Sequence, residues 1–156
     1  LFASDGELFK LPVNTNLIRI KDNKLWVHRD IVGESNSIQF KGDWFNTGDL
    51  VEVVNDTHFK ILGRDGNVVK VAGYNINLES VEQRIQKIDN IKMCRVYSES
   101  NSVLGNILIC EVVTYNDTNV RELKLQMKTH LEQYEVPSKI KCVNSIELNE
   151  NGKIKR

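Results

Sequence analysis

Three polar residues of the chain are of types that could act on a phosphorylated ligand, and each lies in a short motif that contains glycine. Asp49 ends the tripeptide T-G-D, and a carboxylate has two acceptor oxygens that can bind two neighbouring hydroxyl groups. Arg64 lies within G-R-D-G, and Lys153 follows N-G near the C-terminus. The lysine is a mobile point charge that could stabilise negative charge on a phosphate. Each residue also has an ordinary interpretation: an aspartate that supports its own turn, an arginine in a surface ion pair, and a lysine in a basic tail.

The residues before Arg64 predict β-structure that would hold the first two of these side chains. Apolar runs flank the turn K-D-N-K at 21–24, and apolar residues alternate with polar ones on both sides of 55–57. These patterns predict two β-hairpins. Residues 47–49 are predicted to form a turn of small residues, with the Asp49 carboxylate at the mouth of a strand.

The residues after Arg64 predict alternating strands and helices. Asn77 can cap a helix whose apolar residues recur at helical spacing, and Asn119 can cap a second one. The predicted elements are, in order, a strand over 68–71, a loop over 73–76, a helix from Leu78, strands over 91–97 and 107–115, a helix from Val120 to Tyr134 that Pro137 stops, and short strands over 139–143 and 145–148.

The composition narrows the classes of function. Lys and Arg number 21, as do Asp and Glu, so the balanced charge argues against nucleic acid or an anionic membrane as a partner. No apolar run approaches the roughly 20 residues needed to span a bilayer. Cys94, Cys110 and Cys142 lie in apolar runs and are expected to be buried free thiols, which favours a reducing, cytoplasmic compartment. The histidines lack metal-ligand spacing, so no metal site is expected.

Three motifs occur together in a fixed order. They are W-F-x-T-G-D-L at 44–50, G-R-D-G-x-V-V-K-V-x-G-Y-x-I at 63–76 and N-G-K-x-x-R at 151–156. In this combination they resemble the C-terminal part of the adenylate-forming superfamily, which comprises acyl-CoA synthetases, adenylation domains of nonribosomal peptide synthetases, and luciferases. The resemblance covers Trp44 to Arg156.

The resemblance implies an α+β fold in two parts. Residues 1–63 would be a β-rich segment from the end of a large N-terminal domain, and residues 67–156 a compact, mobile α+β lid domain. Residues 64–66 would form the hinge between them. The chain is accordingly expected to be a fragment of a longer enzyme and inactive alone, because the phosphate-binding loop of the superfamily is absent from it.

The resemblance also implies a role for each of the three polar residues. Lys153 would contact the substrate carboxylate and the α-phosphate of ATP while the acyl-adenylate forms. Asp49 would bind the ribose hydroxyls of the nucleotide, and Arg64 would contact the same nucleotide.

Four further residues correspond to the moving part of these enzymes. Asp65 and Gly66 match the hinge, where the superfamily usually has aspartate or lysine in place of Gly66, and glycine can absorb a large backbone rotation. Lys70 and Gly73 match the segment that lines the thiol channel in the second half-reaction. Gly73 also has an ordinary interpretation as a loop glycine.

The implied activity is that of an ATP- and Mg²⁺-dependent ligase that converts a carboxylic acid to acyl-AMP and then to a thioester. The thiol would be CoA or the phosphopantetheine arm of a carrier protein, and the missing N-terminal domain would be the main partner. Asn75 stands where many CoA-using members have arginine, and Ser80 replaces the first acid of the usual E-I-E motif. These departures favour a divergent member that loads a carrier protein. The alternative from another class is a non-catalytic interaction module that keeps the fold.

Overall fold

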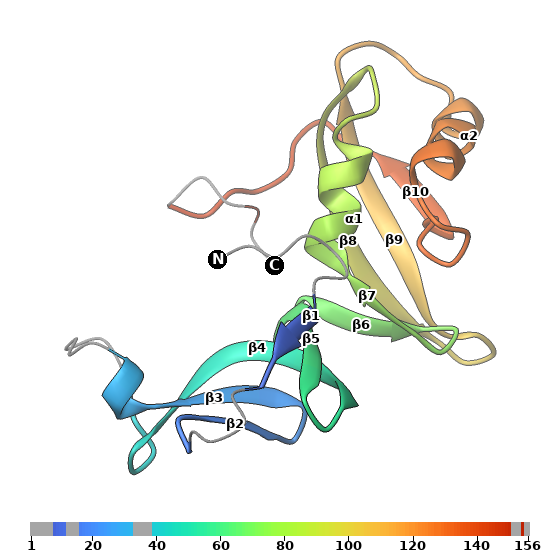
Figure 1. The fold of residues 1–156 in the computed structure, drawn as a ribbon. Coiled ribbons are helices and arrows are strands. Elements are labelled where there is room, and N and C mark those ends of the chain that lie inside the picture. Colours follow the sequence, from blue (N-terminus) through green and yellow to red (C-terminus); the bar gives the residue numbers. More distant parts are fainter. Residues whose placement is uncertain (1–7, 12–15, 33–38, 151–153, 155–156) are drawn as a thin grey trace. The chain divides into compact units, whose positions relative to one another are not determined.

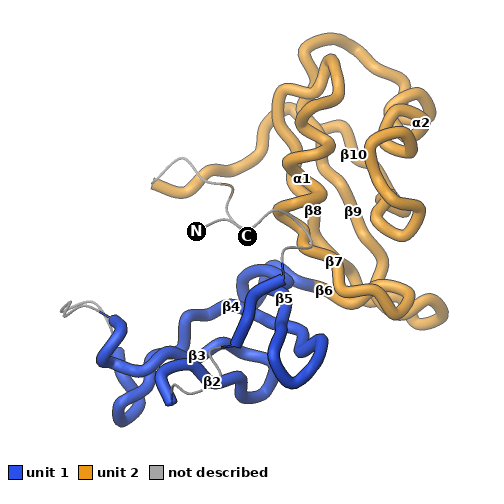
Figure 2. Tube along the Cα trace, in the orientation of Figure 1, with its two compact units in different colours: residues 1–68 blue, residues 69–156 orange. Residues whose placement is uncertain are grey.

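The computed structural model describes residues 8–11, 16–32, 39–150 and 154. The chain forms two compact units, Leu1–Val68 and Val69–Arg156 (Figure 2). The predicted hinge at 64–66 stays a prediction.

The first unit is a five-stranded antiparallel sheet in the order β1-β5-β4-β3-β2 (Figure 1). Both predicted hairpins are confirmed. Asp22 and Asn23 adopt the positive φ values, 53° and 57°, that a tight two-residue β-turn requires. A one-turn 3₁₀ helix, Arg29–Ile31, follows β3. The strands are β1 Leu8–Lys10, β2 Ile18–Lys21, β3 Lys24–His28, β4 Trp44–Asn55 and β5 His58–Arg64.

The predicted turn at 47–49 is wrong, because these residues lie inside the long strand β4. Gly48 has a φ of 78° there, which gives the strand a local change of direction without a turn. Further along, Leu50 pairs with Gly63 and Val51 with Ile61, so Leu62 is the extra residue of a β-bulge. Local sequence favoured a turn, and the pairing of β4 with its neighbours overrides it.

The second unit opens with a β-hairpin and continues as a helix-covered sheet. The loop predicted over 73–76 is wrong, since most of it belongs to β7. Strands β8, β9 and β10 form a three-stranded sheet in the order β10-β9-β8, and β10 runs parallel to β9 after a crossover through α2. The elements are β6 Val68–Val71, β7 Tyr74–Asn77, α1 Leu78–Ile85, β8 Ile91–Asn101, β9 Gly105–Thr114, α2 Val120–His130 and β10 Lys139–Cys142.

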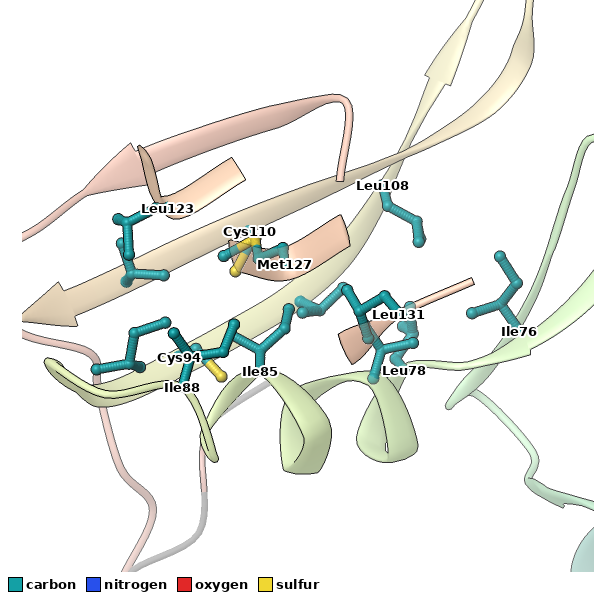
Figure 3. Packing of buried hydrophobic residues seen from close by; sticks show 14 residues of the cluster. Ile76, Leu78, Ile85, Ile88, Cys94, Leu108, Cys110, Leu123, Met127 and Leu131 are labelled. Atoms are coloured by element: carbon teal, nitrogen blue, oxygen red, sulfur yellow. The ribbon is translucent and has the colours of Figure 1, made fainter. Parts of the chain in front are cut away.

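Helices α1 and α2 cover one face of this sheet and build the main core. Asn77 caps α1 by accepting a hydrogen bond from the Ser80 backbone N–H (3.2 Å), as predicted. Figure 3 shows side chains of both helices meeting those of β8 and β9. The buried cluster is Ile76, Leu78, Val81, Ile85, Ile88, Ile91, Cys94, Val96, Leu108, Cys110, Val112, Leu123, Met127 and Leu131. The α+β class predicted from the sequence is therefore confirmed.

Three further expectations for the second unit are wrong. Helix α2 ends at His130, well before Pro137, and Leu131 and Tyr134 pack against the core from the segment that follows it. No strand forms over 145–148, where Leu148 makes an isolated bridge instead. Cys142 is exposed, because it lies on β10 at the edge of the sheet, whereas Cys94 and Cys110 are buried free thiols as expected.

Two acidic residues are buried in this unit, and each has a structural partner. The Glu82 carboxylate of α1 accepts a hydrogen bond from the Val96 backbone N–H of β8 (2.7 Å). The Glu135 carboxylate accepts hydrogen bonds from both terminal nitrogens of the Arg84 guanidinium, Nη1 at 2.8 Å and Nη2 at 2.6 Å. Because a buried charge is costly unless it is paired, these contacts fix α1 against β8 and against the segment after α2.

The β6–β7 turn holds a strained residue. Ala72 has a φ of 48° and Gly73 a φ of 91°, so both central residues are left-handed. Glycine adopts this conformation freely, whereas alanine is disfavoured by roughly 1 to 2 kcal/mol.

We expect Ala72→Asn to raise the free energy of unfolding of the second unit by about 0.5 to 1 kcal/mol, because asparagine tolerates the left-handed region better than alanine. Urea unfolding of the 156-residue chain, followed by NMR signals of β8 and β9, would measure the change. Ala72→Ser adds a polar group without this preference and should have little effect. Equal stability of the asparagine variant and the wild type would contradict the prediction.

Candidate functional site

Asp49 and Arg64 are brought face to face by the pairing of β4 with β5. They are cross-strand partners in the ladder, and Arg64 Nε lies 3.2 Å from Asp49 Oδ1. The Asp49 side chain is 22% exposed and that of Arg64 is 62% exposed. The aspartate is thus held at the sheet surface, with the arginine reaching over it from the solvent side. The two residues that sequence reasoning singled out separately form one pair.

The same arginine also fixes the backbone next to Asp49. One of its terminal nitrogens, Nη1, donates a hydrogen bond to the Thr47 carbonyl oxygen. A Cβ atom at Gly48 would lie 3.4 Å from that nitrogen, so the glycine leaves room for the guanidinium as well as permitting the positive φ. The T-G-D segment and Arg64 therefore depend on each other for their geometry.

The residue after Arg64 is also anchored within the first unit. The Asp65 backbone N–H donates to the Gly48 carbonyl (2.8 Å), and its carboxylate accepts from Lys24 Nζ (2.5 Å). Sequence reasoning missed Lys24. The alternating pattern predicted its hairpin, but no local signal says which residue lies opposite, 41 positions away.

Gly66 differs from Arg64 and Asp65 in the space around it. Its φ is 90°, and a Cβ atom built there would have nothing within 4 Å. A hydrogen bond from the Asn67 N–H to the Arg64 carbonyl (2.9 Å) closes the turn around it. Of the two predicted hinge residues, Asp65 is held by contacts and Gly66 is sterically unrestrained.

Lys70 and Gly73 lie on the β6–β7 hairpin of the second unit. The Lys70 side chain is exposed, and its carbonyl accepts a hydrogen bond from Asn106 Nδ2 (3.1 Å). The tight turn accounts for the φ of Gly73, and the predicted place of this glycine in the thiol channel stays a prediction. Nothing lies within 4 Å of the position of a Cβ at Gly73.

Lys153 lies outside the described residues. Ile154, the residue that follows Lys153, forms an isolated antiparallel bridge with Leu148. Its predicted role stays a prediction.

The remaining reactive groups do not suggest another chemistry. Within the described ranges, no group of three or more His, Cys, Asp and Glu residues could hold a metal ion. A hydrogen bond with the Cys94 side chain, together with burial, raises the pKa of Cys110, so this thiol stays protonated. The described helices include none long and apolar enough to cross a membrane.

One aromatic feature also escaped sequence reasoning. The rings of Tyr74 and Tyr134 are stacked, with centroids 4.0 Å apart and an angle of 4° between their planes. Tyr74 follows Gly73 directly and is 52% exposed. The pair ties the hairpin to the segment after α2, which the sequence placed inside the helix.

The chain has the fold of the C-terminal portion of adenylate-forming enzymes. Among solved structures, o-succinylbenzoate CoA synthetase from Bacillus subtilis aligns with a TM-score of 0.66 and 20% identity over 88% of this chain and 32% of its own. A fatty acyl CoA synthetase from Mycobacterium tuberculosis aligns with a TM-score of 0.56 and 25% identity over 74% of this chain and 23% of its own.

Residues 80–153 match the family described as the AMP-binding enzyme C-terminal domain. A Staphylococcus epidermidis protein named as a long chain fatty acid-CoA ligase, VraA, is 30% identical over 98% of the chain. Gramicidin S synthase 2 from Brevibacillus brevis is 32% identical over 70% of the chain. The chain spans 34% of the length of the first relative and the matched region only 2% of the second.

We expect Arg64→Met in the 156-residue chain to speed hydrogen exchange of the Asp65 backbone N–H about fivefold, because the variant loses the contacts that fix T-G-D. This corresponds to about 1 kcal/mol, a modest value since the arginine is largely exposed. Arg64→Lys should give an exchange rate between those of the wild type and Arg64→Met. Arg29→Met, which removes an exposed ion pair with Asp43 in the same unit, should leave this exchange rate unchanged. If Arg64→Met exchanges like the wild type, Arg64 does not support the segment.

Proposed function

We propose that this chain is the C-terminal part of an ATP-dependent acid–thiol ligase of the acyl-CoA synthetase type. The observation that carries the proposal is the cross-strand pairing of Asp49 with Arg64, in a chain whose residues 80–153 match the AMP-binding enzyme C-terminal domain family. The enzyme would join a carboxylic acid to a thiol in two half-reactions.

In the first half-reaction, a carboxylate oxygen of the acid attacks the α-phosphorus of ATP, the bond to the β-phosphate oxygen breaks, and pyrophosphate leaves. Asp49 would accept hydrogen bonds from the ribose hydroxyls. The Asp49 oxygen Oδ1 is already oriented by Arg64 Nε (3.2 Å), so the carboxylate needs little reordering when the nucleotide arrives. The largely exposed Arg64 guanidinium can contact the same nucleotide.

Lys153 would supply the positive charge that the first half-reaction needs. Negative charge builds up on the α-phosphate and on the leaving oxygen during attack, and a positioned ammonium lowers the energy of that state. Mg²⁺ would be held by the phosphates of ATP and by the N-terminal domain, because the described residues offer no cluster of carboxylates for it.

In the second half-reaction, the sulfur of the thiol attacks the acyl carbon and AMP leaves. The second unit would turn about Gly66, where a Cβ atom would have nothing within 4 Å, while Asp65 stays fixed to the first unit. Lys70 and Gly73 would then line the path of the thiol. Asn75, in the place of an arginine common in CoA-using members, favours the phosphopantetheine arm of a carrier protein over CoA.

The missing N-terminal domain is the main partner in this proposal. That domain would contain the phosphate-binding loop and the pocket for the acid. The buried free thiols Cys94 and Cys110 are compatible with a reducing, cytoplasmic compartment.

The decisive test is ATP–pyrophosphate exchange by the full-length enzyme with a panel of carboxylic acids. We expect Lys153→Ala to lower the exchange rate at least about 100-fold, because a charge that acts only in the transition state is lost. Thioester formation from supplied acyl-AMP should continue near the wild-type rate. Lys155→Ala changes a neighbouring lysine and should retain exchange. A wild-type exchange rate for Lys153→Ala would exclude the proposed role.

We expect Gly73→Ala to slow thioester formation about tenfold and to spare ATP–pyrophosphate exchange. The added Cβ would narrow the path of the thiol and strain a turn with a φ of 91°. Gly42→Ala is the matched control, since Gly42 has a φ of 66° and open space around it in the first unit. Equal slowing of both half-reactions would show that Gly73 acts through general stability.

A further inference from the structure

The turn between β8 and β9 exposes two adjacent apolar side chains. Val103 is 86% exposed and Leu104 is 68% exposed. Single exposed apolar residues are common on protein surfaces and need no explanation. Two neighbours at the end of a hairpin form a small apolar tip, and no charged residue occurs between Ser100 and Cys110 to keep other apolar surfaces away.

This apolar tip, Val103 and Leu104, is held by specific hydrogen bonds. Asn101 Oδ1 accepts from the backbone N–H groups of both residues, at 3.0 and 2.9 Å. Gly105, with a φ of 75°, then starts β9. The backbone of the turn is therefore held while both side chains are exposed, so that little backbone entropy remains to be lost when the tip is covered.

The tip is continuous with the hairpin that carries Lys70 and Gly73. Asn106, two residues after Leu104, donates a hydrogen bond from Nδ2 to the Lys70 carbonyl (3.1 Å). Figure 1 shows the end of the β8–β9 hairpin beside the β6–β7 hairpin. A protein domain that approaches Lys70 and Gly73 from the solvent side would therefore contact the tip as well.

We propose that the tip docks on the large N-terminal domain of the same enzyme and stabilises the orientation in which Lys70 and Gly73 serve thioester formation. This inference rests on the proposed function. Two side chains are far too few for an interface between separate molecules, which buries at least about 1,000 Å². They are enough to favour one orientation of a tethered unit over another, because the partner domain is always present at high effective concentration.

The test compares the two half-reactions of the full-length enzyme carrying Val103→Ser and Leu104→Ser together. ATP–pyrophosphate exchange should stay at the wild-type rate, and thioester formation from supplied acyl-AMP should fall about tenfold or more, as expected when two apolar side chains lose their contacts. Val103→Ile with Leu104→Met keeps the tip apolar and should retain the rate. Leu125→Ser, on α2 and 58% exposed in the wild type, is the matched control and should affect neither half-reaction.

Other outcomes would overturn the inference. If both half-reactions continue at the wild-type rate, or if both fall together, the tip does not act on one orientation. A loss seen only with a carrier protein, and not with CoA or pantetheine as acceptor, would assign the tip to the carrier protein. A loss of self-association on sedimentation, without a change in the half-reactions, would assign it to a second copy. A wild-type enzyme that forms no acyl-adenylate with any acid would overturn the proposed function itself, and this inference with it.

Discussion

The pairing of β4 with β5 in one register is the constraint on which the candidate site depends. A shift by one residue would turn alternate side chains to the other face of the sheet. The bulge at Leu62 lets the Asp49–Arg64 pair and the pair of buried Val51 with half-buried Ile61 coexist in one ladder. A charged pair and an apolar pair are thus both accommodated. The geometry of Asp49 is a property of the sheet, and only secondarily of its own motif.

The second unit is built to be rigid inside. Its core lies on one face of a three-stranded sheet, and charged side chains such as Arg95 and Glu111 pair on the other face (2.6 Å). The Arg84–Glu135 pair and the stacked tyrosines connect segments that the core alone would leave loosely attached. A unit of this kind can change its orientation as a whole, because its internal contacts do not need a partner to hold them.

Local patterns predicted the features that neighbouring residues determine. The helix cap at Asn77, the hairpin turn at Asp22 and Asn23, and the α+β class follow from spacing and residue type. The resemblance of three motifs predicted the family that residues 80–153 match, and the role of Lys153 stays a prediction. Errors arose where distant residues decide the structure. The T-G-D segment is straightened into β4 by its partner strands, and α2 stops at His130 although its apolar spacing continues to Tyr134. The Lys24–Asp65 contact depends on strand order, which no local pattern encodes.

The buried carboxylate of Glu82 has a consequence for how the second unit can exist in solution. Strand β8 lies at the edge of its sheet, where an open backbone N–H would invite pairing with any extended chain nearby. By accepting the hydrogen bond of Val96, a side chain of α1 occupies that position permanently. An extended chain that approaches β8 at Val96 therefore meets a side chain in place of an open backbone N–H. At this point of the edge, the buried acid opposes pairing with other polypeptides.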